Sequence, residues 1–127
     1  MNSSTNITFD SFQIIDNTVV DVIIDQAKGD KQFVSMLFES FLTEGYETLS
    51  TVEVALKNKD YKTLGESVHA LKGLAGTMGV SQVYEICKKI DASLKFSIID
   101  EALVLLPLLS TKYQVAKEFI TANYIIV

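Results

Sequence analysis

Apolar residues recur at spacings of three and four along most of this chain. Such spacing is typical of helices that bury one face, and no stretch shows the strict alternation of a half-buried strand. Five segments carry an apolar stripe, and short polar turns separate them. The pattern therefore predicts an all-α fold, an antiparallel four-helix bundle with an additional short N-terminal helix.

Aspartates mark the starts of the first three predicted helices. Asp16, Asp30 and Asp60 each precede an apolar stripe, and a carboxylate at this position accepts hydrogen bonds from first-turn amides. Gly29 and Gly79 follow the first and third stripes, where a glycine favours the end of a helix. The second helix contains Gly45 in its middle, and the pattern leaves open whether the helix bends there.

The last two helices have serines near their starts. Ser81 opens the fourth helix, and Ser97 with Asp100 forms an S-x-x-D capping pattern for a fifth helix from about Ile98 to Ala122. Pro107 lies inside this fifth helix and lacks a backbone N–H, which predicts a kink or a break.

The two ends of the chain differ in character. Residues 1–12 are polar and are expected to form a flexible lead-in, followed by a bundle domain over 13–127. The apolar ending YIIV either packs on the bundle or contacts a partner.

The aromatic residues of the second helix are expected in the core, although Phe38 lies off the main stripe and could instead line a docking groove; they are Phe33, Phe38, Phe41 and Tyr46.

Composition excludes several classes of function. The net charge of −5 argues against nucleic-acid binding, which needs a clustered basic face. The longest apolar run, 102–109, contains a proline and is too short to insert through a membrane, so we expect a soluble, cytoplasmic protein. With one histidine and one cysteine, the usual zinc or iron sites cannot form, and Cys87 lies on an apolar stripe that predicts core.

The single histidine, His69, is predicted on the solvent side of the third helix. Successive residues of an α-helix are rotated by about 100° about its axis, and on this count His69 lies roughly 130° from the centre of the apolar stripe. The residues of that stripe are Tyr61, Leu64, Val68, Leu71, Ala75 and Met78. Lys72 and three glycines share the histidine's face: Gly65, Gly73 and Gly76. Each glycine costs a helix roughly 0.5–1 kcal/mol relative to alanine, so this face favours close approach by another protein. The alternative is an ordinary surface histidine beside glycines that serve helix packing.

The stretch HALKGLAGTMG resembles the signature of histidine-containing phosphotransfer domains, which is H-x-L-K-G with a glycine six residues after the first. The positions that match are His69, Leu71, Lys72, Gly73 and Gly79, and Gly76 matches a bacterial variant. The likeness extends roughly from Asp16 to Leu109, and many members of the family carry glutamate near the position of Asp91.

The resemblance implies a carrier without a kinase site of its own. His69 would accept a phosphoryl group from a receiver-domain aspartate and pass it to another response-regulator receiver, while Lys72 stabilises the phosphoryl group. Gly65, Gly73 and Gly76 would lie where a receiver docks. No cofactor is expected, because Mg²⁺ belongs to the receiver; a hybrid sensor histidine kinase is the other expected partner. The alternative is a non-catalytic interaction module that binds a receiver or a kinase and regulates it.

Overall fold

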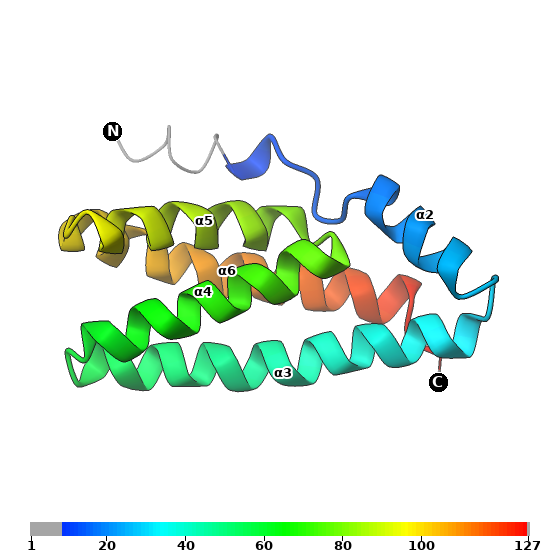
Figure 1. The fold of residues 1–127 in the computed structure, drawn as a ribbon, viewed down its shortest axis with the longest axis horizontal. Helices are drawn as coiled ribbons and strands as arrows, with labels where there is room; N and C mark the ends of the chain where they lie inside the picture. Colours follow the sequence, from blue (N-terminus) through cyan, green and yellow to red (C-terminus); the bar gives the residue numbers. More distant parts are fainter. Residues whose placement is uncertain (1–8, 127) are drawn as a thin grey trace.

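The structure is a computed structural model that describes residues 9–126. Its helices, labelled as in Figure 1, are α2 (Asn17–Gln26), α3 (Lys31–Lys57), α4 (Tyr61–Met78), α5 (Ser81–Lys95) and α6 (Ile99–Asn123). The described part of the chain contains no strand, which confirms the predicted all-α class.

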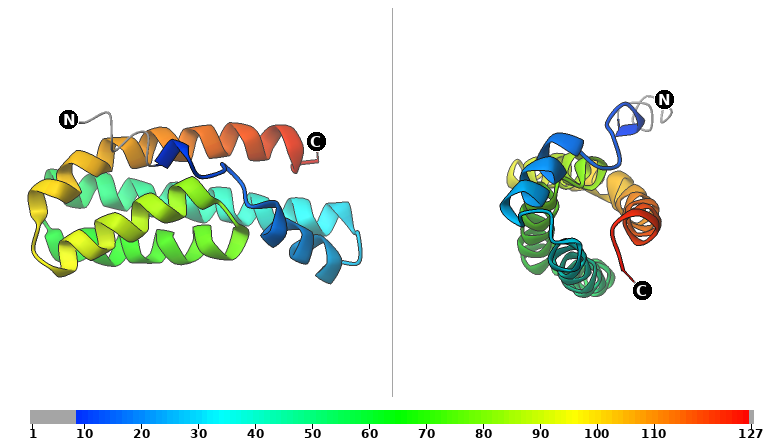
Figure 2. Two further views of the ribbon diagram at one scale, coloured as in Figure 1. Left: turned by 90° about the horizontal axis from the view of Figure 1, so that it is seen from above. Right: turned by 90° about the vertical axis from the view of Figure 1, so that its right-hand side faces the viewer.

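The four long helices form the bundle, and α2 lies across one end of it. Helix α3 packs on α4, α4 on α5, and α5 on α6, whereas α2 contacts the ends of α3 and α4. The end-on view in Figure 2 shows the four helices surrounding a common axis. This arrangement confirms the predicted four-helix bundle with an additional short helix, and it leaves one side of α4 and α5 uncovered.

The predicted helix starts at the three aspartates are confirmed. Asp16, Asp30 and Asp60 accept hydrogen bonds from amides two or three residues further on, at 2.9–3.2 Å. Gly79 ends α4 with a left-handed φ of 71°, as the sequence predicts. The amide of Asp16 donates to the carbonyl of Gly79 at 2.7 Å, which ties the start of α2 to the turn between α4 and α5.

The predicted capping of α6 by Ser97 is wrong. Helix α6 begins after Ile98, which makes no side-chain cap hydrogen bond. Ser97 has a φ of +59° and its amide donates to Leu94 O at 3.1 Å. Ser97 therefore belongs to the left-handed end of α5, and a residue in that conformation cannot adopt the extended backbone of an N-cap.

Neither Gly45 nor Pro107 breaks its helix, because α3 and α6 continue through these residues. Of the kink or break expected at Pro107, the break is therefore wrong and the kink stays a prediction. Gly45 has a packing role, because a Cβ there would lie 2.8 Å from the Tyr113 hydroxyl oxygen. That hydroxyl donates to Leu42 O at 2.7 Å. The missing side chain thus lets the Tyr113 ring of α6 reach the backbone of α3.

The core differs from the sequence prediction at two aromatic positions, Phe33 and Tyr46, whereas Phe38 lies in the core as expected. Phe38 is fully buried and stacks on Tyr124 with ring centroids 4.6 Å apart, so it does not line a docking groove. Phe33 and Tyr46 are exposed, because they lie outside the stripe through which α3 contacts α4 and α6. The stacked Tyr124 also shows that the apolar C-terminal segment packs on the bundle, where Ile126 N–H donates to Ser35 Oγ at 2.9 Å.

The packed part of the chain begins earlier than predicted. Phe9 is 3% exposed and belongs to the core, and Gln82 of α5 donates to Phe12 O at 2.9 Å. These contacts correct the predicted lead-in for residues 9–12; residues 1–8 lie outside the described part. Among residues 9–126, no helix combines the length and the apolar character that crossing a membrane requires.

Candidate active site around His69

His69 lies on the uncovered side of α4. Its side chain is 61% exposed, whereas Val68 and Leu71 on the inner side of the same helix are fully buried. The predicted exposure of the imidazole is therefore confirmed. Burial of the stripe fixes the rotation of α4, and that rotation turns His69 outward.

A carboxylate of the neighbouring helix holds the imidazole in place. Asp91 of α5 is 6% exposed, and its Oδ2 lies 3.3 Å from His69 Nδ1. Lys72 Nζ donates to the same oxygen at 2.8 Å, and Lys95 Nζ lies 3.2 Å from it. One carboxylate oxygen of Asp91 thus contacts His69 and Lys72 of α4 and Lys95 of α5.

These contacts keep Asp91 ionised. Burial by itself would raise the pKa of Asp91, but the hydrogen bonds from Lys72, His69 and Lys95 lower it to about 2. The hydrogen bond between Lys72 and Asp91 also raises the pKa of Lys72, so Lys72 and Asp91 are both charged at neutral pH. A carboxylate this deeply buried would be costly without its partners.

The ionised carboxylate assigns the tautomer of His69. An ionised carboxylate can only accept a hydrogen bond, so the ring hydrogen of a neutral imidazole lies on Nδ1 and points to Asp91. The other ring nitrogen, Nε2, then carries the lone pair. The arrangement therefore offers an oriented nucleophile on an exposed surface.

A hollow of about 420 Å³ lies beside the imidazole. It is lined by Tyr61, Lys62, Gly65, Glu66, His69, Asp91, Leu94 and Lys95. Gly65 lies one helical turn before His69, and a Cβ on it would meet only Leu94 Cδ1, at 3.8 Å. The hollow leaves room for an incoming group next to the imidazole.

Residues 36–111 match the Hpt domain family, and this match covers more than half of the chain. The chain belongs to the Hpt domain family. Multistep phosphorelay regulator 1 of Schizosaccharomyces pombe is 27% identical to it over 79 residues, which is 61% of this chain and 27% of that protein. Phosphorelay intermediate protein YPD1 of Candida albicans is 29% identical over 77 residues, which is 61% of this chain and 42% of that protein. The chain thus spans less than half the length of these relatives.

A solved structure shows the same fold. Histidine-containing phosphotransfer protein B (HptB) from Pseudomonas aeruginosa PAO1 superposes with a TM-score of 0.79, at 18% sequence identity. The superposition covers 87% of this Hpt domain and 94% of the other chain, so nearly all of the bundle architecture is shared.

The three glycines on the histidine's face of this Hpt domain have different surroundings. Gly65 lines the hollow with His69, while a Cβ on Gly73 would meet nothing within 4 Å. A Cβ on Gly76 would lie 3.1 Å from Tyr84 Cδ1 of α5. Gly76 therefore has a packing reason, as the alternative interpretation of these glycines expected, although the sequence did not identify Tyr84 as its neighbour. A role in receiver docking stays a prediction for all three.

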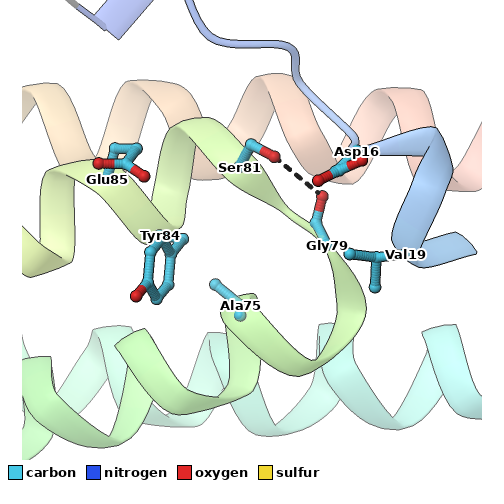
Figure 3. A pocket seen from close by; sticks show the side chains of 8 residues that line it. Asp16, Val19, Ala75, Gly79, Ser81, Tyr84 and Glu85 are labelled. Atoms are coloured by element: carbon cyan, nitrogen blue, oxygen red, sulfur yellow. Dashed lines mark hydrogen bonds between the residues drawn. The ribbon is translucent and has the colours of Figure 1, made fainter.

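Figure 3 shows the second hollow on this side of the Hpt domain, where Tyr84 points from α5 toward α4. This hollow of about 290 Å³ lies at the end of α4, between the α4–α5 turn and α2. Val19 of α2 lies beside Gly79, and the Ser81 hydroxyl is hydrogen-bonded to Gly79 O at 3.4 Å. The hollow therefore lies at the end of α4 that packs against α2, and Gly76 on the histidine's face lines it.

The sequence prediction noted Asp91 only as a position near which family members carry glutamate and gave it no role, and it missed Lys95 altogether. A signal for Asp91 was present, because it follows Cys87 by four residues and so lies on the apolar stripe of α5. A carboxylate on a buried stripe needs a partner, and Lys95 follows it by a further four residues. Cys87 itself is fully buried, and burial raises the pKa of its thiol to about 12, which confirms its place in the core.

Proposed function

We propose that this Hpt domain is a histidine phosphotransfer carrier. His69 accepts a phosphoryl group from the phosphorylated aspartate of one receiver domain and passes it to another response-regulator receiver. The observation that carries the proposal is an exposed imidazole whose Nδ1 is hydrogen-bonded to a buried, ionised carboxylate. Membership of the Hpt family and the phosphorelay names of the two relatives support the same chemistry.

The acceptor atom in this proposal is Nε2. Its lone pair forms a bond to phosphorus while the bond from phosphorus to the receiver's carboxylate oxygen breaks, and the bonding electrons return to that carboxylate. Phosphoryl transfer has a loose transition state, so positioning and charge stabilisation contribute most of the catalysis. The hydrogen bond between Nδ1 and Asp91 holds the ring in place and so supplies the positioning.

Asp91 is proposed to stabilise the charge that forms on the ring. Attack through Nε2 leaves the imidazole positively charged with its hydrogen still on Nδ1, and the ionised Asp91 accepts that hydrogen bond. In the onward transfer, the electrons of the phosphorus–Nε2 bond return to the ring, which becomes neutral again. No proton has to move in either direction.

Lys72 is proposed to offset the charge of the phosphoryl group. It lies one turn after His69 on the same side of α4, and its Nζ is hydrogen-bonded to Asp91. The ammonium thus neutralises the carboxylate that would otherwise repel a phosphoryl group. The glycine face, with Gly65 and Gly73 open, is proposed as the surface on which a receiver docks.

The partners follow from this chemistry. Receiver domains supply the phosphorylated aspartate and the Mg²⁺ ion, and a hybrid sensor histidine kinase supplies the phosphoryl group to the first receiver. The carrier itself is proposed to use no cofactor, to have no kinase activity and to act in the cytoplasm, where these partners carry their signalling domains.

The test is transfer of labelled phosphoryl from a phosphorylated receiver to the wild-type domain and to His69→Gln. We expect an acid-labile, base-stable label on the wild type and none on the variant. Label on the variant would show that the site is wrong. Binding and regulation of a receiver without any label, unchanged by His69→Gln, would favour the interaction module instead.

A further inference from the structure

The cluster around His69 carries a positive charge in an otherwise acidic chain. The chain has a net charge of −5, yet two ammonium groups, Lys72 and Lys95, surround the single carboxylate of Asp91. One lysine is enough to neutralise Asp91. The second therefore leaves one positive charge in excess beside the exposed imidazole.

The two lysines are held differently. Lys72 Nζ lies 2.8 Å from Asp91 Oδ2 and its side chain is only 23% exposed, whereas Lys95 Nζ lies at 3.2 Å and its side chain is 64% exposed. An exposed ion pair contributes little to stability, while a partly buried charged hydrogen bond contributes more. Lys95 is therefore the lysine that leaves Asp91 at lower free-energy cost.

Lys95 also lies beside the imidazole of His69. It lines the same hollow as His69, and its Nζ shares a single oxygen of Asp91 with His69 Nδ1. A lysine side chain has four rotatable bonds, so an exposed one moves between two neighbouring acceptors without any change in the backbone.

We propose that Lys95 is a second phosphoryl-binding residue, which pairs with Asp91 in the unphosphorylated domain and turns to the phosphoryl oxygens once His69 is phosphorylated. This inference rests on the proposed function, because it concerns the phosphorylated form of the same site. Lys72 and His69 remain on Asp91 and keep its carboxylate paired. A phosphoryl group brings about −1.5 to −2 charges, so the excess positive charge then has a partner.

The experiment loads the domain without a receiver. Phosphoramidate is the donor: Nε2 bonds to phosphorus, the bond from phosphorus to nitrogen of the donor breaks, and ammonia leaves with the proton it needs from water. The phosphoryl group is then titrated by ³¹P NMR in the wild type, Lys95→Met, Lys95→Arg and Lys72→Met. Lys89→Met is the matched control, since Lys89 is exposed on the same helix, two residues before Asp91 and so on another side.

We expect Lys95→Met to raise the apparent pKa of the phosphoryl group by roughly 0.2–0.7, which is a change of about 1.6- to 5-fold and corresponds to one exposed charge contact. Lys95→Arg should keep the wild-type value, and Lys89→Met should not differ from wild type. The shift should persist in 0.5 M salt, because a direct contact is screened less than a distant charge. Thermal unfolding of each variant checks that the fold is intact.

Equal phosphoryl pKa values in Lys95→Met and Lys89→Met would overturn the inference, as would a shift seen only in Lys72→Met or only at low salt. These outcomes differ from a failure of the proposed function. In that case the wild type would show no phosphohistidine signal, or His69→Gln would show one.

Discussion

Replacing Gly73 with alanine should stabilise the free domain and weaken its reaction with a receiver. A Cβ at this position meets nothing within 4 Å, and Gly73 lies inside α4, where alanine is the better helix former. The methyl group therefore has no structural cost in the isolated protein. Its only cost arises against a partner that approaches this face.

The size of the stabilisation follows from helix propensity. Glycine in a helix interior is less favourable than alanine by roughly 0.5–1 kcal/mol. Unfolding entropy is about 2.1 cal/mol/K per residue, so a chain of 127 residues should gain roughly 2–4 °C in Tm. An extra methyl in a closely packed interface costs about 1–3 kcal/mol, which slows transfer from a receiver by at least about five-fold.

Two assays separate these effects. Thermal unfolding measures the stability of the free domain, and the rate of transfer from a phosphorylated receiver measures docking. Loading by phosphoramidate should be unchanged, because the small donor needs no docking surface. Gly45→Ala is the matched control: it makes the same chemical change in α3, but its Cβ would lie 2.8 Å from the Tyr113 hydroxyl and should lower Tm.

A lower Tm for Gly73→Ala would refute the argument from open space. A higher Tm with an unchanged rate of transfer from the receiver would show that the partner does not approach Gly73. If Gly45→Ala also raised Tm, the close packing of Tyr113 against α3 would not limit stability as the structure indicates.

Two further predictions concern ionisable groups. Because the pKa of Asp91 is about 2 in the folded domain, below its usual 3.8, Asp91 stabilises the fold above about pH 3.8 and this contribution is lost as pH falls toward 2. The difference in unfolding free energy between wild type and Asp91→Asn, measured in urea, should therefore shrink from pH 6 to pH 2; a constant difference would contradict it. Cys87, whose thiol pKa is raised to about 12 by burial, should not react with a thiol reagent at pH 8 until urea unfolds the domain. Rapid modification of the native protein would show that the thiol is accessible.

The sequence predicted most of the fold, because its helices are amphipathic and their starts carry strong local signals. Asp30 and Asp60 cap α3 and α4 through contacts within three residues, so nothing outside the segment is needed to find them. The helix start predicted from the S-x-x-D pattern at Ser97 is wrong for a local reason too, because Ser97 adopts the left-handed conformation that ends α5.

The exposure of His69 was predictable because it depends only on the rotation of one helix about its axis. Its contact with Asp91 was not, because it depends on how α4 and α5 are aligned against each other. A stripe in one helix does not encode that alignment. For the same reason, the sequence could not predict that Gly76 lies close to Tyr84, because Tyr84 belongs to the neighbouring helix.

The residues that meet at Asp91 all come from one helical hairpin, in which the turn at Gly79 and Val80 joins α4 directly to α5. The proposed reactive centre is therefore local in the chain, while α3 and α6 act as its scaffold. Substitutions in the scaffold that keep the crossing of the two hairpin helices should therefore leave the geometry around Asp91 unchanged. Changes at the C-terminal segment or around Tyr113 should then alter the free energy of unfolding, and with it the lifetime of the folded protein in the cell. The proposed chemistry at His69 should stay the same.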